Sequence, residues 1–122
     1  MNNTTAQDIS YPKKLQNVKR NIRSLTSAQP GVMEAFTKLH KTAVATGALD
    51  TKTKELMALA ISITSRCDDC IAHHIYDAIE ANATREEIAD AIGLAILMGG
   101  GTSMIYATHA IEALDQFCED AR

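Results

Sequence analysis

Residues that stop and start helices divide the sequence into segments, and each segment carries apolar residues at α-helical spacing. The first helix is expected from about Pro12 to Leu25, before the breaking stretch "SAQPG". Pro30 suits the first turn of a second helix, which we expect to end near Gly47. No segment alternates apolar and polar residues with the period of a β-strand. The predicted fold class is therefore all-α, with about six helices.

The remaining helices have recognisable ends. Asp50 is a suitable N-cap for a third helix, and Asn82 tolerates the left-handed conformation that ends a fourth. The sequence "TREE" at 84–87 matches a capping box, which predicts a fifth helix over 85–98. Gly99, Gly100 and Gly101 lack the residues of a phosphate-binding loop, so we expect a tight turn into a last helix.

The apolar stripes of these helices predict which residues are buried. In the first two helices they are Leu15, Val18, Ile22 and Leu25, then Val32, Met33, Phe36, Leu39, Ala43 and Val44. In the third and last helices they are Leu56, Leu59, Ala60 and Ile63, then Ile105, Ala107, Ile111 and Leu114. With 46% hydrophobic residues, no Trp and only two Phe, the composition favours close-packed helices in a single domain.

Charge and targeting signals give little indication of nucleic acid or membrane partners. A basic cluster, comprising Lys13, Lys14, Lys19, Arg20 and Arg23, lies on the first helix without a recognition motif, so we interpret it as a solvated face. The apolar runs are too short to span a bilayer, and the first residues do not resemble a secretory signal. Three cysteines are a poor basis for a secreted disulfide framework. We expect a cytoplasmic protein, where a C-x-x-C pair is typically redox-active or metal-binding.

The stretch "ELMALAISITSRCDDCIAHH" (residues 55–74) carries the candidate chemistry. On one unbroken helix, Glu55 and Cys70 would be about 22 Å apart along the axis. We expect a break at Thr64–Ser65, with Ser65 as the N-cap of the fourth helix and Asp68 as its capping-box partner. The third helix would then fold back antiparallel, with Glu55 near the cysteines.

Within the fourth helix, Cys67, Cys70 and His74 have the spacing i, i+3 and i+7, which places them on one face. His74 lies one turn beyond Cys70 and is expected to accept its proton or stabilise its thiolate, the nucleophilic form. Glu55 would complete a Cys–His–Glu proton relay. A C-x-x-C pair can also close into a disulfide after one sulfur is oxidised.

Several alternatives stay open at the level of the residues. The two cysteines could be small buried apolar residues, or they could bind zinc together with His73 or His74. His73 alone is expected to be solvated or to support the site. His40 and His109 are interpreted as surface or core histidines, and Cys118 as an incidental thiol.

The stretch at 52–92, "KTKELMALAISITSRCDDCIAHHIYDAIEANATREEIADAI", followed by "GGG" and a helix of small residues, resembles the AhpD-like proteins of the carboxymuconolactone decarboxylase superfamily. The resemblance covers roughly residues 30–115. Its core pattern is a glutamate, eleven residues, C-x-x-C, three residues and a histidine. Glu55, Cys67, Cys70 and His74 match this pattern.

The resemblance implies an AhpD-like helical bundle, one domain over residues 1–122, assembled as a homo-trimer or homo-hexamer. It implies a thiol-dependent peroxidase or disulfide reductase that needs no metal and no organic cofactor. Cys70 would be the peroxidatic residue that passes through sulfenic acid, and Cys67 the resolving partner and proton donor. Glu55 and His74 would form the relay. The substrate would be a hydroperoxide or a disulfide, and an external thiol would reduce the enzyme again.

Two details of the sequence bear on this assignment. The helix N-terminus alone would favour Cys67 as the thiol of lower pKa, whereas the resemblance favours Cys70, which also has His74 one turn away. AhpD itself often has a histidine just before the second cysteine, and this chain has Asp69 there. A carboxylate at that place would disfavour a thiolate and weaken peroxidase activity.

Two other functions are compatible with parts of the sequence. A lactone decarboxylase is suggested by the superfamily name, although such enzymes as a rule lack the cysteine pair. The other is a non-catalytic oligomeric binding protein, whose behaviour would not change if both cysteines were replaced by serine. The stretch "AIGLAILMGGGTSMIYATHAI" (residues 91–111) is more apolar than one face of a surface helix requires, which favours a homo-oligomer.

Overall fold

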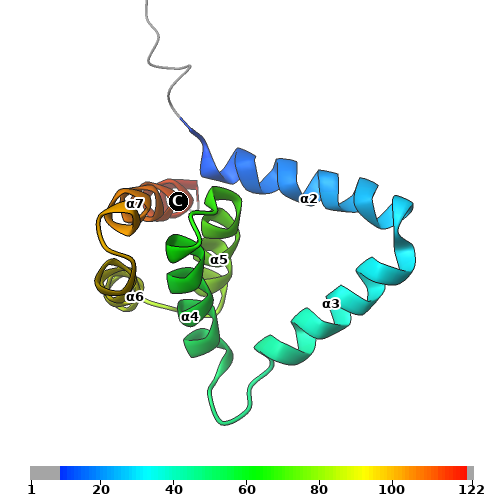
Figure 1. Ribbon diagram of the computed structural model, residues 1–122, viewed down its shortest axis with the longest axis horizontal. Helices are drawn as coiled ribbons and strands as arrows, with labels where there is room; N and C mark the ends of the chain where they lie inside the picture. Colours follow the sequence, from blue (N-terminus) through cyan, green and yellow to red (C-terminus); the bar gives the residue numbers. More distant parts are fainter. Residues whose placement is uncertain (1–8, 121–122) are drawn as a thin grey trace, which may run out of the picture.

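The computed structural model describes residues 9–120, and this part of the chain consists of six α-helices joined by short turns. In chain order they are α2 (Tyr11–Ala28), α3 (Pro30–Val44), α4 (Thr51–Thr64), α5 (Asp68–Glu80), α6 (Arg85–Gly99) and α7 (Gly101–Asp120). The predicted all-α class is confirmed (Figure 1). Over residues 9–120, every helix falls short of the length or the apolar character that a membrane span requires.

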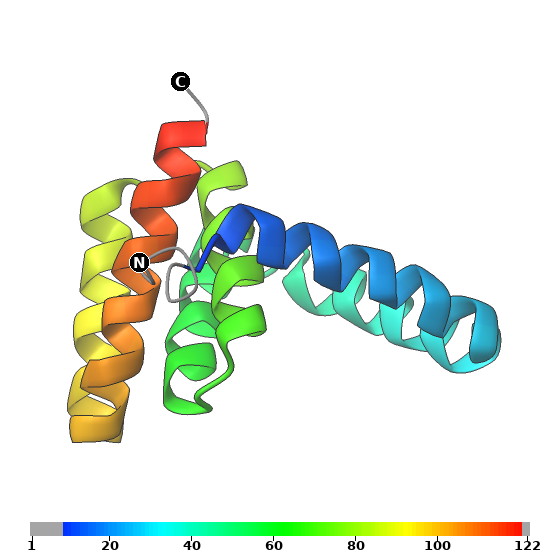
Figure 2. The same ribbon diagram turned by 90° about the horizontal axis from the view of Figure 1, so that it is seen from above.

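Helices α4 to α7 form the body of the molecule. In Figures 1 and 2, α4 and α5 lie side by side, and α6 and α7 pack next to them. Each helix contributes its apolar stripe to one core, whose larger buried side chains are Leu59, Ile63, Ile71, Ile75, Ile88, Ile92 and Leu114. Small residues of α7, Ala107, Ala110 and Ala113, are also buried and let the helices approach closely. The core therefore forms from helical spacing and from the alanine-rich composition together.

Helices α2 and α3 form an arm that extends away from the body. Both views show the two helices meeting at the end distant from the body, where Gln29 is the only residue between them (Figure 2). Only the first turns of α2 join the core, through Tyr11 and Leu15. The start of α2 and the end of α3 thus lie next to the body, and the rest of the arm is largely exposed (Figure 1).

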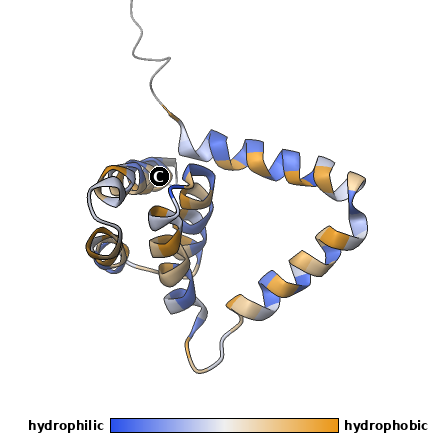
Figure 3. Ribbon diagram, viewed as in Figure 1, coloured by the Kyte–Doolittle hydropathy of each residue, from blue (hydrophilic) through white to orange (hydrophobic). Residues whose placement is uncertain are grey.

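The predicted burial of the arm is confirmed at Leu15 and is wrong for most of its other apolar residues in this chain on its own. Helix α3 has no buried residue, and Phe36 and Leu39 are 58% and 61% exposed. In α2, Ile22 and Leu25 are also exposed. The helical spacing is as predicted, and apolar residues recur along both helices of the arm (Figure 3). The arm leans away from the core, however, so many of these residues stay exposed in the part of the chain that the structure describes. In the last helix, Ile105 and Ile111 are likewise exposed, whereas Ala107 and Leu114 are buried.

The predicted helix caps are confirmed at three places. The Asp50 carboxylate accepts a hydrogen bond from the Thr53 amide at 2.8 Å and starts α4. Thr84 and Glu87 form the reciprocal capping box of α6. Asn82 has a φ of 69° and ends the chain segment after α5 in the left-handed region. These caps fix where the helices of the body begin and end.

The glycine run forms the predicted tight turn. Gly100 alone separates α6 from α7, with φ 72° and ψ −150°, a conformation that essentially only glycine adopts. A Cβ on Gly99 would lie 2.7 Å from the Cβ of Ser103, which is buried on α7. The turn thus needs glycine at 100 for its backbone angle and at 99 for the close approach of the two helices.

Replacing Gly100 by alanine tests the role of this backbone angle. An alanine Cβ at 100 meets no other atom within 4 Å, so the expected loss comes from backbone strain alone. We expect Gly100→Ala to lower the free energy of unfolding by about 1–3 kcal/mol. Gly101→Ala is the matched control, because its Cβ is also unobstructed and its φ is not positive. Denaturant unfolding at one fixed protein concentration compares them, and equal stability of the two variants would contradict this account.

Candidate active site

The chain reverses between α4 and α5, as predicted, but with different capping residues. Ser65 is the C-cap of α4, and its amide donates back to the Ile61 carbonyl. Arg66 then adopts a φ of 58°, and Cys67 is the extended N-cap of α5. The prediction of Ser65 as the N-cap of α5 is therefore wrong. The Ser65 backbone still belongs to the end of α4, and the left-handed Arg66 comes after it, so the N-cap is Cys67. The reversal itself is confirmed.

Cys67 and Cys70 lie at the N-terminus of α5 and are joined by a disulfide bond. The Cys67 sulfur also accepts a hydrogen bond from the Cys70 amide at 3.2 Å, so it takes the position of a capping oxygen. Cys70 is on the first turn of the helix, and both residues are partly exposed. The pair thus lies where the amides of a helix start favour negative charge on sulfur.

Glu55 and His74 are brought together by the antiparallel packing of α4 on α5. The Glu55 carboxylate lies 2.8 Å from Nδ1 of His74, and Glu55 is only 3% exposed. A buried carboxylate with one partner holds that imidazole in a fixed orientation and leaves its other ring nitrogen for other contacts. This contact was predicted from the sequence. Their catalytic roles stay predictions.

An ion pair and a hydrogen bond to a histidine hold the two acidic residues that lie between the cysteines. Lys14 of α2 lies 3.2 Å from the Asp69 carboxylate, and Nδ1 of His109 on α7 lies 2.7 Å from Asp68. The unfavourable charge of Asp69 next to Cys70 is therefore partly offset by a lysine. The sequence predicts neither contact: it places Lys14 on a solvated face and His109 at the surface or in the core. His109 is 41 positions from Asp68 and Lys14 is 55 positions from Asp69, and no local sequence signal connects residues so far apart.

Tyr11, the first residue of α2, lies near Asp68 at the start of α5. Its side chain is fully buried, and its hydroxyl has no hydrogen-bond partner within residues 9–120. Burial, and then the negative charges of Asp68 and Glu112, raise the pKa of Tyr11 above its ordinary value. Tyr11 therefore stays neutral in the physiological range and serves as a packing residue beneath the start of α5.

His73 points to a different partner from His74. Its Nε2 lies 2.9 Å from Asp77, one turn further along α5. This hydrogen bond raises the pKa of His73; desolvation lowers it less, and the charges of Asp77 and Glu55 also raise it. Burial raises the pKa of Asp77, but the hydrogen bond and the charge of His73 and the nearby His74 and His40 together hold it below its usual value. The pair is thus favoured in its ionised form.

Possible metal ligands do not include the cysteines. Within residues 9–120, ligand atoms approach one another in two groups, His40–His73–Asp77 and Glu55–His74–Asp77. The cysteine sulfurs are bonded to each other and belong to neither group. The alternative of zinc bound by the cysteine pair therefore gains no support. Cys118 is a free, partly buried thiol on α7.

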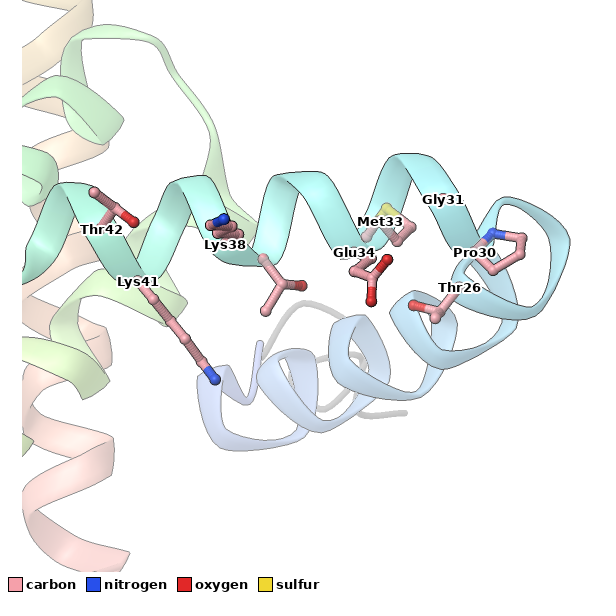
Figure 4. A pocket seen from close by; sticks show the side chains of 9 residues that line it. Thr26, Pro30, Gly31, Met33, Glu34, Lys38, Lys41 and Thr42 are labelled. Carbon is pink, nitrogen blue, oxygen red and sulfur yellow. The ribbon is translucent and has the colours of Figure 1, made fainter.

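A hollow of about 630 Å³ lies in the arm, between α2 and α3 (Figure 4). Its lining includes Glu34, Lys38 and Lys41, which project from α3, together with small and polar residues. It contains no cysteine and no histidine. Glu55 lies on α4, and the cysteine pair and His74 lie at the start and along α5, so the hollow is not the candidate active site.

The comparisons with known proteins identify the family. Residues 30–113 match the carboxymuconolactone decarboxylase family, and the chain belongs to it. A family member from Legionella pneumophila has a solved structure with a TM-score of 0.85 and 36% identity, over 88% of this chain and 96% of that one. A second solved structure, from Thermotoga maritima, has a TM-score of 0.78 and 32% identity, over 87% and 91% of the two chains.

The similarity extends to sequences of other organisms. An uncharacterized protein of Cupriavidus necator is 37% identical over 102 residues, which is 84% of this chain and 90% of that protein. An involvement in the antioxidative response has been suggested for the Thermotoga maritima protein. The resemblance inferred from the C-x-x-C pattern is thus confirmed at the level of the family.

Removing Lys14 tests whether it offsets the charge of Asp69. In Lys14→Ala the carboxylate acts unopposed on the Cys70 thiolate, so alkylation of reduced Cys70 is expected to slow about two- to fivefold. This range corresponds to an exposed ion pair worth up to about 1 kcal/mol, because Asp69 is half exposed. Peptide mass spectrometry distinguishes Cys70 from the other thiols.

Lys13→Ala is the matched control for this experiment. Lys13 is the exposed neighbour in the same turn of α2, and it has no ion pair within residues 9–120. Its replacement should leave the alkylation rate of Cys70 unchanged. A Lys14→Ala rate equal to that of Lys13→Ala would contradict the proposed role.

Proposed function

We propose that this protein is a thiol-dependent oxidoreductase that reduces hydroperoxides, or disulfides, through Cys67 and Cys70. The observation that carries the proposal is the combination of two elements at one place. A C-x-x-C pair at the start of α5 forms a disulfide, and one to two turns further along the same helix His74 is held by the buried Glu55. The suggested antioxidative role of the Thermotoga maritima relative supports the same reading.

The proposed reaction begins with the Cys70 thiol. His74, oriented by Glu55, accepts the thiol proton directly or through water, and the Cys70 thiolate attacks the outer oxygen of the hydroperoxide. The O–O bond breaks, Cys70 becomes a sulfenic acid, and the alcohol leaves with a proton. Two electrons pass from sulfur to the peroxide in this step.

The second step closes the disulfide. Cys67 attacks the sulfenic sulfur, the S–S bond forms, and water leaves with the Cys67 proton. The disulfide that results lies at the helix start, with Cys67 as the N-cap of α5 and Cys70 in its first turn. An external dithiol then reduces the disulfide by thiol–disulfide exchange and restores both thiols. For a disulfide substrate, the same thiolate would attack sulfur instead of oxygen.

We also propose that the arm is covered by a second copy of the chain in a homo-trimer or homo-hexamer. The apolar residues of α3, Val32, Phe36 and Leu39, are each about 60% exposed. A matching apolar groove of about 330 Å³ lies between α4 and α6, with Leu56, Met57, Ala60 and Leu94 in its lining. One chain cannot close its own groove because its arm leans away from the body (Figure 1). The arm of one copy in the groove of another buries both surfaces.

The redox proposal is tested by counting thiols in fully reduced protein before and after one equivalent of an organic hydroperoxide. We expect rapid loss of two thiols as a Cys67–Cys70 disulfide, with Cys118 unchanged. Cys70→Ser should abolish this loss. Survival of both thiols would contradict the peroxidase assignment and direct the search to disulfide substrates or lactones.

The oligomer is tested by sedimentation velocity of wild-type protein, Phe36→Glu and Thr37→Glu. A charge at 36 lies on the apolar face of α3, whereas Thr37 faces the hollow of the arm. We expect the wild type and Thr37→Glu to share one oligomer, and Phe36→Glu to sediment as a smaller species. A monomeric wild type, or unchanged sedimentation of Phe36→Glu, would overturn the proposed packing.

A further inference from the structure

A second cluster of chemically active side chains lies beside the candidate active site. It consists of His40 on α3, and of His73 and Asp77 on α5. One ring nitrogen of each histidine and one carboxylate oxygen all lie within 4.8 Å of one another. The redox reaction proposed above uses none of these three residues.

His40 is the unusual member of this cluster. Its Nε2 is buried and has no hydrogen-bond partner within residues 9–120. A buried polar atom without a partner is rare in folded proteins, because it loses its bonds to water and gains none in exchange. The imidazole rings of His40 and His73 are 6.1 Å apart and nearly edge-on, so neither ring donates to the other. The histidine that carries this unsatisfied nitrogen lies beside a second imidazole and a carboxylate, which are further possible ligands for a cation.

We propose that His40, His73 and Asp77 bind a divalent transition-metal ion of the zinc class. Two imidazole nitrogens and one carboxylate oxygen are ligands that zinc accepts, with water in the remaining position. Ligand atoms about 2.0–2.2 Å from a tetrahedral zinc lie about 3.4 Å from one another. The Asp77 carboxylate and Nε2 of His73 are 2.9 Å apart, and a ring nitrogen of His40 lies within 4.8 Å of both ligand atoms, so small side-chain shifts bring the three to this spacing.

Binding replaces a proton by the cation. Nε2 of His73 now donates its hydrogen to Asp77, and that proton leaves to the solvent when the nitrogen binds the metal. The side chains of His73 and Asp77 are 33% and 25% exposed, so water can reach the ion and complete its coordination. No electron transfer accompanies this step.

The site would join the arm to the body. His40 is carried by α3, whereas His73 and Asp77 belong to α5, and α3 otherwise buries no residue. A bound ion would therefore fix the C-terminal half of α3 against the body. The Asp77 carboxylate also lies within 4.8 Å of ligand atoms of Glu55 and His74. The bound ion would therefore lie next to the proposed relay, although neither Glu55 nor His74 would be one of its ligands.

The experiment is a titration of zinc chloride into untagged protein with the Cys67–Cys70 disulfide intact, followed by calorimetry. We expect one zinc ion per chain. His40→Gln and His73→Gln should each weaken binding at least about tenfold, since even loss of supporting residues around a metal costs 10–100-fold in affinity. His109→Gln is the matched control, because His109 lies on α7, contacts Asp68 and is not a member of the proposed ligand set. Cobalt should replace zinc and give visible absorption bands in the wild type.

Thermal unfolding with and without zinc provides a second readout. Zinc should raise the midpoint of the wild type and of His109→Gln, and leave those of His40→Gln and His73→Gln unchanged. Circular dichroism without zinc establishes that each variant folds. Absence of binding to the wild type, or binding unaffected by both variants, would overturn the proposal.

The test separates this site from the redox pair. The double variant Cys67→Ser/Cys70→Ser should lose all peroxide-driven disulfide formation and keep its zinc affinity. His40→Gln should keep disulfide formation and lose zinc affinity. Zinc binding that disappears in the double cysteine variant would contradict the proposed ligand set.

Discussion

The reversal of the chain at Ser65, Arg66 and Cys67 is the constraint on which the rest of the site depends. Since only these three residues separate the end of α4 from the start of α5, the two helices run antiparallel, and Glu55 comes to lie 2.8 Å from His74. The same reversal places Cys67 at the N-cap of α5, where its sulfur accepts the amide of Cys70. One turn of irregular backbone thus sets both the position of the cysteines and the contact that orients the histidine.

The helices of the body could be predicted from the sequence because their signals are local. The Thr84–Glu87 capping box and the Asp50 cap act within one turn, and Gly100 is required by its own backbone angle. The position of the arm could not be predicted in this way. Helical spacing identifies which face of α3 is apolar, but it does not say whether Phe36 meets its own core or another surface.

The site shows the same division between local and distant information. The spacing of Cys67, Cys70 and His74 and the break before them predicted the Glu55 contact. The partners of Asp68 and Asp69 were missed, because His109 and Lys14 come from helices distant in sequence. The sequence predicts Ser65 as the N-cap because serine is in general a better cap than cysteine, but with Arg66 in the left-handed region the N-cap falls two residues later, at Cys67.

In the proposed reaction, Glu55 and His74 act as one unit on the cysteine pair. The most direct measurement is a double-mutant cycle on the rate of Cys67–Cys70 disulfide formation by a hydroperoxide, with Glu55→Gln, His74→Gln and both together. If the two residues form a relay, each single variant slows the reaction about 10²–10⁴-fold, and the double variant is no slower than the slower single. Single variants that react at the wild-type rate, or effects that multiply in the double variant, would contradict it.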